Sequence, residues 1–242
     1  MIDELQAKGY CVLKSHFSAA LIHTCAGRFA RVLRDYVKAH HDMPNRGPRR
    51  HFLPMPFSCF APDFFFDPQI LHLVRTVMDH RIVADQWGCD VPLQGSADQA
   101  LHADYQRPLF PEIPDLPLPT YFLVVNFGLI DITAAHGPME IAPGTHRMPG
   151  AAALDAVACG DIALEPVPLA IGDVLIRHPW ALHRGTPNRT ATARPLVTIR
   201  YVRRWYADDS RNVNAIPRDV WDQLTMEQQS MLRFPVAQNT QS

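Results

Sequence analysis

Short β-prone runs fill the second half of the chain, and they constrain the fold more than any other feature of the sequence. From about residue 82 onward, runs rich in apolar and β-branched residues alternate with Gly, Pro, Asn and Asp, as in RIVADQW, TYFLVVNFGLI, GDVLIRH and RPLVTIRYVRRW. Several short strands separated by such turn residues are typical of a β-sandwich or a β-barrel. The sequence therefore predicts a β core over about residues 82–206.

Helical patterns precede this core. Residues 10–13 (YCVL) form a short β-prone run, and apolar residues then recur at helical spacing after Ser18, whose hydroxyl can cap the helix. Prolines crowd residues 42–66, which we expect to be irregular. Asp67-Pro68 places a capping side chain and a first-turn proline in the favoured order, so a second helix is expected to begin there.

A helical segment also follows the core and begins near Pro217. The sequence shows no internal repeat and no linker that would separate two domains. We therefore expect a single domain over residues 1–242, mainly β with flanking helices. Its parts would be a helical N-terminal part over about 1–80, the β core over about 82–206 and a helical tail over 207–242.

The charge balance excludes some classes of partner. With 23 Lys and Arg against 24 Asp and Glu, the formal net charge is -1. Nucleic acids and anionic membrane surfaces attract strongly basic proteins, so neither is expected as a partner. Hydrophobic residues make up 47% of the chain and charged residues 19%, which allows a sizeable core. We expect a small-molecule substrate as the partner, and a homo-oligomer stays open.

The N-terminus and the cysteines favour a cytoplasmic location. The stretch MIDELQAKGYCVLKSH is acidic where a signal peptide needs basic residues, and it lacks an apolar stretch. No run approaches the roughly 18 apolar residues of a transmembrane helix. The five cysteines lie far apart and never form a CxxC pair, which argues against a disulfide framework and a cysteine zinc site. We therefore expect a protein of the reducing cytoplasm.

The stretch QALHADYQRP carries a histidine and an aspartate two residues apart, His102 and Asp104. In a β-strand, residues i and i+2 point to the same face, so a strand would direct this imidazole and this carboxylate at one point. That geometry suits two ligands of one metal ion. An isolated HxD is also a common coincidence, so the interpretation needs a third ligand elsewhere in the chain.

Residues 172–202 offer that third ligand. The stretch GDVLIRHPWALHRGTPNRTATARPLVTIRYV predicts a strand, a loop with His178 and His183, and another strand. A distal histidine would complete a two-histidine, one-carboxylate triad, which is typical of non-haem Fe(II) oxygenases. Arg194 follows His183 by eleven residues, and a buried arginine there would clamp the far carboxylate of a dicarboxylic co-substrate with two hydrogen bonds.

A third block, HGPMEIAPGTHR at residues 136–147, predicts a turn, a short strand and a Pro-Gly turn. With this block the ordered set resembles the phytanoyl-CoA dioxygenase family of Fe(II)/2-oxoglutarate oxygenases. The family pattern begins with a GY-V-L segment, matched by GYCVL at residues 9–13, and continues with HxD and a turn close to NGP…PGSH. It ends with GD…H…H…PNR…R, matched over residues 172–194, so the resemblance covers about residues 3–203.

The resemblance implies a fold and a set of roles. The implied fold is a double-stranded β-helix, or cupin-like jelly roll, with helices packed outside. His102, Asp104 and His183 would bind Fe(II) and form the catalytic centre. Arg194 would bind the C5 carboxylate of 2-oxoglutarate, and Gln99 matches a position where some relatives contact the same co-substrate. His178 is then expected to support the fold or to face solvent.

Two residues depart from the family pattern. Met139 stands where several relatives have a Thr or Ser that touches 2-oxoglutarate, and His136 replaces the usual Asn. A methionine cannot make that contact, because its thioether is at best a weak hydrogen-bond acceptor. These departures bear on how the co-substrate is held and leave the implied metal triad intact.

The implied reaction is the hydroxylation of an unactivated C–H bond in a small organic metabolite. It would use Fe(II), 2-oxoglutarate and O2 and would release succinate and CO2. Relatives also catalyse desaturation and epoxidation at the same kind of site. A cupin-like metal-dependent hydrolase or isomerase that does not use 2-oxoglutarate is a second hypothesis, under which Arg194 has no role. A catalytically silent binding module is a third, against which the complete triad counts.

Candidate substrate-binding residues lie mainly outside the β core. They are the aromatic-rich stretch at residues 52–66 and four single residues, Trp87, Tyr105, Arg107 and Trp205. A pocket with several apolar and aromatic walls would suit a small or medium-sized organic molecule. An acidic group on that molecule would meet an arginine, for which the further candidates are Arg49, Arg50 and Arg203.

Overall fold

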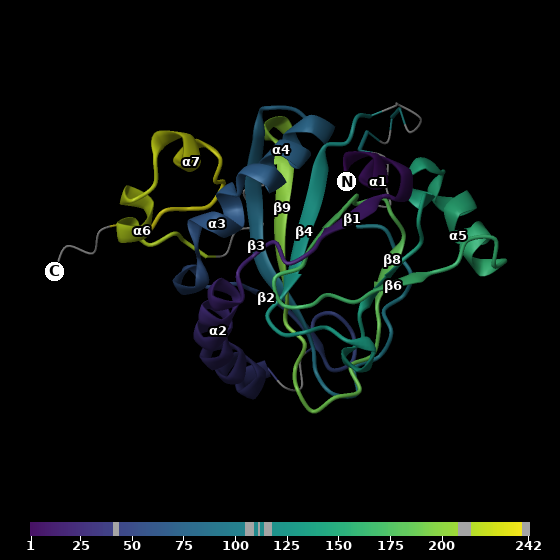
Figure 1. Ribbon diagram of the computed structural model, residues 1–242, viewed down its shortest axis with the longest axis horizontal. Helices are drawn as coiled ribbons and strands as arrows, with labels where there is room; N and C mark the ends of the chain where they lie inside the picture. The colour runs from purple at the N-terminus through teal and green to yellow at the C-terminus, as the bar shows by residue number, and fades with distance from the viewer. Residues whose placement is uncertain (41–43, 105–108, 111, 114–117, 208–213, 239–242) are drawn as a thin grey trace.

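The computed structural model describes residues 1–40, 44–104, 109–110, 112–113, 118–207 and 214–238. Within these residues the chain forms two antiparallel β-sheets with helices outside them (Figure 1). The mainly β architecture with flanking helices that the sequence predicts is therefore confirmed. No helix in the described part of the chain is both long enough and apolar enough to cross a membrane.

The larger sheet has six strands in the order β1-β7-β4-β9-β3-β2, and every neighbouring pair is antiparallel. The two central strands are almost entirely buried, because both faces of the sheet are covered. This explains why their sequences read as continuous apolar runs and not as alternating ones. The strands are β1 (Tyr10–Leu13), β2 (Arg50–Pro54), β3 (Ile82–Pro92), β4 (Phe122–Gly128), β7 (Val174–Arg177) and β9 (Leu196–Arg203).

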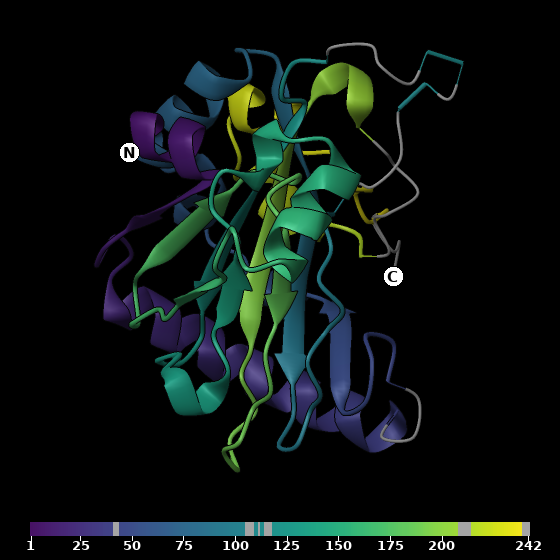
Figure 2. The same cartoon turned by 90° about the vertical axis from the view of Figure 1, so that its right-hand side faces the viewer.

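The smaller sheet has three strands in the order β6-β5-β8 and lies on the opposite side of the large sheet from helix α2 (Figures 1 and 2). Gly and Pro residues limit these short strands: Gly137-Pro138 and Pro143-Gly144 flank the central strand of the three. The three strands are β5 (Met139–Ile141), β6 (Glu165–Val167) and β8 (His183–Gly185). The two sheets together form the double-layered core of a jelly roll, and this leaves a space between them for a site.

Helices α2 (Ala19–His40), α3 (Pro62–Phe66) and α4 (Pro68–Val77) cover the outer face of the large sheet (Figure 1). Ser18 Oγ accepts a hydrogen bond from the amide of Leu21 at 3.2 Å, and Asp67 Oδ1 accepts two from the first turn of α4. Both helix starts predicted from the sequence are therefore confirmed. The apolar side of α2 packs on the sheet through Ile22, Cys25 and Phe29, which are all buried.

Shorter helices complete the structure. The α-helices are α1 (Ile2–Lys8), α5 (Gly150–Ala158), α6 (Arg218–Asp222) and α7 (Met226–Ser230). The 3-10 helices are η1 (Phe57–Cys59), η2 (Ala134–His136), η3 (Thr145–Arg147) and η4 (Arg204–Tyr206). Figure 2 shows α5 in front of the strands and α2 behind them, so helices lie on both outer sides of the β core.

The N-terminal part differs from the sequence prediction in one respect. Residues 42–66 were expected to be irregular, but they include η1 and α3 as well as β2, which pairs with β3 along the edge of the large sheet. Prolines are compatible with an edge strand, since one side of the strand needs no ladder partner. The N-terminal part expected over about residues 1–80 thus contributes both edge strands, β1 and β2, in addition to its helices.

Candidate functional site

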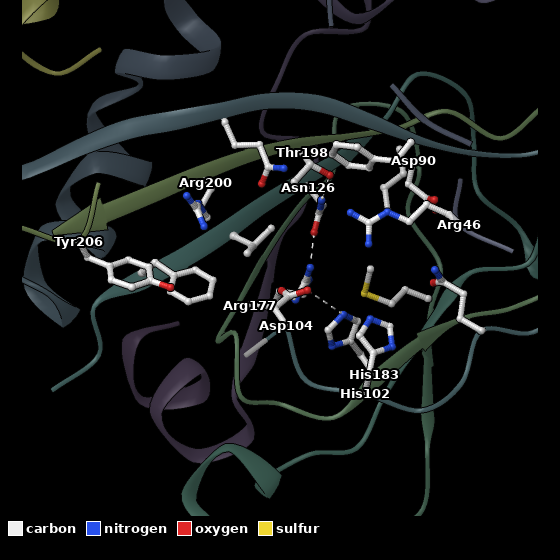
Figure 3. Close-up of a pocket in the computed structure, with 17 residues that line it drawn as sticks. Arg46, Asp90, His102, Asp104, Asn126, Arg177, His183, Thr198, Arg200 and Tyr206 are labelled. Atoms are coloured by element: carbon white, nitrogen blue, oxygen red, sulfur yellow. Dashed lines mark hydrogen bonds and ion pairs between the residues drawn. The ribbon is translucent and has the colours of Figure 1, made fainter. Parts of the chain in front are cut away.

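A cavity of about 200 Å³ lies between the two sheets, and Figure 3 shows the side chains that line it. The large sheet provides its floor. The small sheet and the segment that contains His102 and Asp104 provide the opposite wall. The cavity is small compared with drug-sized pockets, which fits compact ligands.

The register of the large sheet explains the composition of the floor. Residues directly opposite each other on neighbouring strands share a face, so each row of partners presents its side chains together. In one row Val124 pairs with Arg177 on one side and with Arg200 on the other. Asn126 and Thr198 form the next row, and all five of these residues line the cavity.

The third row lies farther along the same strands. Asp90 pairs with Leu196 of β9 and with Phe52 of β2, and all three residues line the cavity. In the neighbouring row, Gly88 pairs with Thr198, and a Cβ atom on Gly88 would come within 2.5 Å of the Phe52 ring. Glycine at this position therefore lets the Phe52 ring lie close against the strand.

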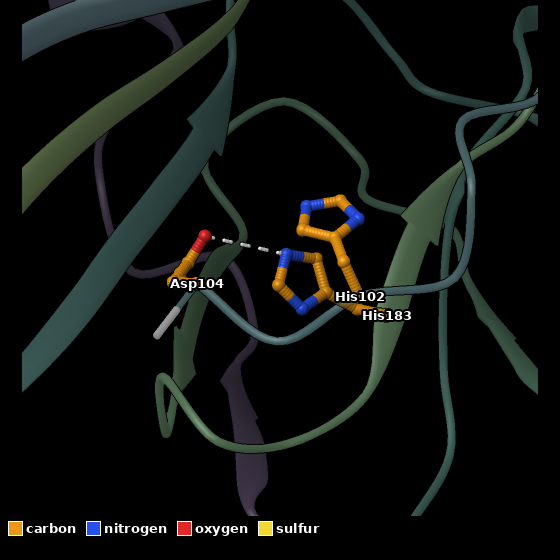
Figure 4. Close-up of side chains that lie close together, drawn as sticks. All are labelled: His102, Asp104 and His183. Atoms are coloured by element: carbon orange, nitrogen blue, oxygen red, sulfur yellow. Dashed lines mark ion pairs between the residues drawn. The ribbon is translucent and has the colours of Figure 1, made fainter. Parts of the chain in front are cut away.

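Three potential metal ligands face this floor from the opposite wall. His102, Asp104 and His183 each offer one donor atom, and these atoms all lie within 4.8 Å of one another (Figure 4). His183 is 3% exposed, and its Nε2 lies 3.6 Å from Asp104 Oδ1. A single small cation between three such donors matches the two-histidine, one-carboxylate arrangement that leaves the other positions of the metal open.

Backbone pairing brings the two histidines together. His102 and His183 form an isolated antiparallel bridge, with hydrogen bonds of 3.0 and 2.8 Å between their backbones. The regular strand expected at His102 and Asp104 is replaced by this isolated bridge. The Asp104 amide donates to the Pro179 carbonyl oxygen at 2.9 Å, where the partner segment turns.

Both imidazoles are oriented by backbone carbonyls. Nδ1 of His102 lies 2.7 Å from the carbonyl oxygen of Ala100, and Nδ1 of His183 lies 2.9 Å from that of Ala181. A carbonyl oxygen only accepts, so each Nδ1 carries a proton, and in a neutral imidazole Nε2 then keeps its lone pair. Nε2 is therefore the atom available to a metal. Burial and the nearby Arg177 lower the pKa of His183 to about 3, which keeps this imidazole neutral.

Asp104 is held by a buried arginine. Arg177 Nη1 donates to Asp104 Oδ2 at 2.5 Å, while Oδ1 faces His183. Burial raises the pKa of the Asp104 carboxyl, but the charge and hydrogen bond of Arg177 outweigh it and hold this pKa well below its usual range. The carboxylate is therefore ionised, with one oxygen engaged by Arg177 and the other directed at the histidines.

Arg177 also connects the candidate metal ligand Asp104 to the floor of the cavity. Its Nε donates to Asn126 Oδ1 at 3.2 Å, and Asn126 Nδ2 donates to Thr198 Oγ1 at 2.9 Å (Figure 3). A continuous hydrogen-bonded chain thus runs from Asp104 across strands β7, β4 and β9. Such buried and connected networks fix the orientation of each member.

A second arginine cluster lies behind the third row. Arg194 and Arg50, each 1% exposed, both donate to Asp90 Oδ2, at 3.1 and 3.0 Å. Nε and Nη1 of Arg194 form no hydrogen bond within the described part of the chain. Burial lowers the pKa of Arg194, and the Asp90 carboxylate opposes this shift. One carboxylate shared by two buried guanidinium groups leaves donors for a further anion.

Other residues singled out in the sequence also line the cavity. Gln99 does so, and its Oε1 accepts a hydrogen bond from the Gly185 amide at 3.0 Å. Met139 lies on β5 opposite Gly185 and also lines the cavity, so the departure from the family pattern is inside the site. His178 is buried away from the triad and lies 3.1 Å from the Thr120 hydroxyl through Nε2.

Neither Trp87 nor Trp205, the two expected substrate residues that the structure describes, lines the cavity. Trp87 is 4% exposed and packs against Phe64 and Phe65 in the core, because it points to the opposite face of β3 from Gln86. Trp205 is 55% exposed and lies beside Tyr121, while its neighbour Tyr206 lines the cavity. Tyr105 and Arg107 lie outside the described residues.

The remaining arginine candidates also have other positions. Arg203 pairs with Asp79 and donates to the Thr120 carbonyl, and Arg49 is exposed and bonds to the Gln94 carbonyl. Of the aromatic stretch at residues 52–66, Phe52 lines the cavity and the Phe64 and Phe65 side chains are in the core. The expected aromatic pocket is thus replaced by a mainly polar one.

Three arginines that line the cavity were not among the residues predicted from the sequence: Arg46, Arg177 and Arg200. Arg177 and Arg200 are 6% and 3% exposed, and each interrupts an otherwise apolar strand. Arginine is almost never buried without a partner, so its presence inside a buried strand was an available signal.

Comparison with known proteins settles the family. The sequence matches the model of the family described as phytanoyl-CoA dioxygenase (PhyH) over residues 5–196, which is most of the chain. The chain belongs to the phytanoyl-CoA dioxygenase family. Members of this family are Fe(II)/2-oxoglutarate-dependent enzymes that also use O2, so an enzyme with these cofactors is confirmed for this chain.

Solved structures confirm the jelly-roll fold for this family member. AviO1 from Streptomyces viridochromogenes Tue57 has a TM-score of 0.64 at 16% identity and covers 86% of this chain and 95% of its own. The epimerase SnoN from nogalamycin biosynthesis, solved with Fe3+, alpha ketoglutarate and nogalamycin RO, has a TM-score of 0.63 at 18% identity, covering 83% and 81%. EctD from S. alaskensis with bound Fe has a TM-score of 0.63 at 17% identity, covering 87% and 76%.

Proposed function

We propose that this family member hydroxylates an unactivated C–H bond of a small organic metabolite, with 2-oxoglutarate as co-substrate and release of succinate and CO2. The observation that carries the proposal is the convergence of the His102, Asp104 and His183 donors at the wall of a polar cavity. Asp104 argues against one alternative outcome, a halogenation. Halogenases of related type need that ligand position vacant for chloride, and here a carboxylate fills it.

The donor set fits Fe(II). Both imidazoles use Nδ1 for a backbone carbonyl and present Nε2 to the ion, and Arg177 leaves one oxygen of the ionised Asp104 carboxylate for it. These three side chains would hold the ion on one side and leave its cavity-facing side for the co-substrate and O2. When bound, Fe(II) and 2-oxoglutarate supply the oxidising chemistry, and the protein residues position the reactants.

The arginine cluster supports a co-substrate site in the third row. Nε and Nη1 of Arg194 have no hydrogen-bond partner among the described residues. Gln99 lines the cavity near this cluster, since a Cβ atom on Gly185 would approach both Gln99 Oε1 and Arg50 Nη1. A C5 carboxylate would take the two-pronged hydrogen bond that a guanidinium offers. Asp90 would then share Arg194 and Arg50 with the co-substrate or give way to it.

The residues of the wall and floor would also exclude water and keep the ligands oriented. Arg177 holds Asp104 through a charge-assisted hydrogen bond, and the backbone carbonyls hold both imidazoles. This preorganisation avoids rearrangement of the ligands when the substrate binds. Met139, on strand β5, would add an apolar side chain beside the co-substrate and no hydrogen bond to it.

The reaction outcome is open to alternatives of the same cofactor class. Solved structures of similar fold include the epimerase SnoN and the carbocyclase SnoK, so one architecture supports several oxidative outcomes. A desaturation or epoxidation would use the same triad. A metal-dependent hydrolase or isomerase without 2-oxoglutarate would leave the unsatisfied donors of Arg194 without a role.

Anaerobic titration tests the proposal. The apoprotein is titrated with Fe(II) and then with 2-oxoglutarate, and the visible charge-transfer band of the chelated co-substrate is recorded. The band is expected with the wild-type protein and absent with His102→Ala and Asp104→Ala. An exposed-site control, His23→Ala on α2, should keep the band. A wild-type protein that forms no band would contradict the proposal.

A further inference from the structure

The cavity has a second polar end that the co-substrate does not need. Arg200 and Tyr206 lie together at one end of the cavity, and Asp90 and Arg46 lie at the other (Figure 3). Because Arg194 bonds to Asp90, the expected co-substrate site belongs to the Asp90 end. The three candidate metal ligands lie between the two ends, so the Arg200 end is left for the substrate that is oxidised.

Arg200 is held rigidly from behind. Its Nε and Nη2 donate to the two oxygens of Asp85 at 2.7 and 2.5 Å, and Asp85 is fully buried and does not line the cavity. The register of β3 shifts between Ala84 and Gln86, so Asp85 is the extra residue of a bulge. Bulges re-aim side chains next to sites, and this one directs a carboxylate at Arg200 of the neighbouring strand.

This pairing leaves the other edge of the guanidinium for a ligand. Asp85 takes the Nε edge, and the edge formed by Nη1 and the second hydrogen of Nη2 can still donate two parallel hydrogen bonds. Phe122 and Tyr206 flank the group, with ring centroids 5.5 and 5.9 Å from Arg200 Cζ. The site thus combines a fixed cation, which needs an anion, with aromatic surface that can contact an apolar body.

The charge balance of the cavity favours an anion there. More arginines than aspartates line the cavity or form ion pairs directly behind it. The five arginines are Arg46, Arg50, Arg177, Arg194 and Arg200, and the three aspartates are Asp85, Asp90 and Asp104. The whole chain has a net charge of -1, so this positive surplus is local. Fe(II) and the 2-oxoglutarate dianion carry equal and opposite charges and leave the surplus unchanged.

We propose that Arg200 binds the acidic group of the primary substrate, which is a small molecule with a carboxylate or another anionic oxygen group attached to an apolar part. Gln86, opposite Arg200 in the register, lines the same end and adds a neutral hydrogen-bonding group. Val124 lies between Arg200 and Arg177 on the floor, so the apolar part would lie over Val124 with its C–H bonds toward Asp104. This inference rests on the proposed function for the assignment of the two ends.

The test measures binding and not turnover. The probe is phenylacetate, with phenylacetamide as its neutral counterpart, titrated calorimetrically into the anaerobic protein that already holds Fe(II) and 2-oxoglutarate. Benzylphosphonate in a parallel titration distinguishes a preference for phosphate-type groups from one for carboxylates. We expect phenylacetate to bind about tenfold or more tightly than phenylacetamide, since hydrogen bonds to charged groups contribute that much.

Variants assign the effect to Arg200. Arg200→Gln alone would remove the guanidinium that pairs with the buried Asp85 carboxylate, so the main variant is Arg200→Gln with Asp85→Asn. Its affinity for phenylacetate should fall about tenfold or more, to the level of phenylacetamide. The matched control removes the exposed pair on α6, Arg218→Gln with Asp222→Asn, and should bind phenylacetate as the wild type does.

Three results would overturn the assignment. They are equal binding of phenylacetate and phenylacetamide, unchanged phenylacetate affinity in the Arg200/Asp85 double variant, and no phenylacetate binding by the wild type at millimolar concentration. The charge-transfer band is recorded in the same samples. An intact band without Arg200-dependent binding overturns this inference alone. A missing band with Arg200-dependent binding overturns the proposed function and leaves the anion site in place.

Discussion

Arg177 Nη1 lies 2.5 Å from Asp104 Oδ2, so a buried guanidinium holds one oxygen of the candidate metal ligand and leaves the other facing the histidines. This relationship decides how Asp104 can coordinate. An aspartate with both oxygens free can bind a metal through either or both of them. Here Arg177, itself tied to Asn126, restricts Asp104 to one oxygen and keeps more of the ion accessible from the cavity.

Replacing Arg177 should therefore weaken metal binding. We expect Arg177→Met to raise the dissociation constant for Fe(II) about 10- to 100-fold, as loss of a partner that orients a ligand typically does. Arg177→Lys keeps the charge and should recover part of the affinity. Equilibrium dialysis under anaerobic conditions measures both, with Arg204→Met on the exposed side of η4 as the control. Unchanged affinity in Arg177→Met would show that Asp104 needs no such partner.

Arg194 should control the affinity for the co-substrate. Arg194→Gln removes the guanidinium that we assign to the C5 carboxylate, and losing one partner of a buried charged pair costs about 2–5 kcal/mol. The concentration of 2-oxoglutarate that half-saturates the charge-transfer band should rise about 100-fold or more. At saturating co-substrate the band itself should return, because the triad is intact. A hydrolase or isomerase without 2-oxoglutarate would instead keep full activity in this variant.

Alanine variants at two glycines would distinguish the cost of backbone strain from the cost of a steric clash. Gly172 has φ +89°, and a Cβ atom there would lie 2.3 Å from the Phe17 carbonyl oxygen. Gly160 has a similar φ of +84°, but a Cβ atom there would meet no atom within 4 Å. Alanine at Gly160 adds only the strain of a left-handed backbone, about 1 kcal/mol. Alanine at Gly172 adds a clash with backbone as well and should destabilise the protein by about 3 kcal/mol or more. Denaturant unfolding compares the two variants, and equal losses would contradict the close contact with Phe17.

Acid should destabilise the protein partly through His178. Burial and the nearby His146 lower the pKa of His178 to about 3, below its ordinary value of 6.5. The folded state therefore keeps His178 neutral while the unfolded state takes up a proton, so stability falls as the pH decreases from about 6.5 toward 3. Such a group contributes a slope of about 1.4 kcal/mol per pH unit.

His178→Asn should flatten that slope. The free energy of unfolding is measured in denaturant at several values between pH 7 and pH 5, for the metal-free protein. The variant should lose less stability over this range than the wild type, while His23→Asn on the exposed side of α2 serves as the matched surface change. A variant slope equal to that of the wild type would rule out His178 as the source.

The elements that the sequence predicted best carry strong local signals. The caps at Ser18 and Asp67 hydrogen-bond to nearby amides, so the pattern alone contains the interaction. The strands of the core are long apolar runs, whose burial does not depend on which strand lies beside them. The cluster of His102, Asp104 and His183 was implied by the family resemblance, and the structure brings their donor atoms together.

The side-chain positions that the sequence predicted less well depend on strand register and on which face of a strand each residue occupies. Trp87 was assigned to the substrate, but alternation along β3 turns it into the core while Gln86 faces the cavity. A bulge at Ala84–Gln86 changes this alternation and has no clear sequence signal. The row of Arg177, Val124 and Arg200 exists only because three strands distant in sequence pair in one register. Single-sequence reasoning has no access to that pairing.

The most direct test of the central claim is diffraction at the iron absorption edge from crystals grown anaerobically with Fe(II) and 2-oxoglutarate. We predict one anomalous peak among Nε2 of His102, Oδ1 of Asp104 and Nε2 of His183, with the C5 carboxylate of the co-substrate at Arg194. An iron peak elsewhere in the protein, or co-substrate bound away from these residues, would contradict the account.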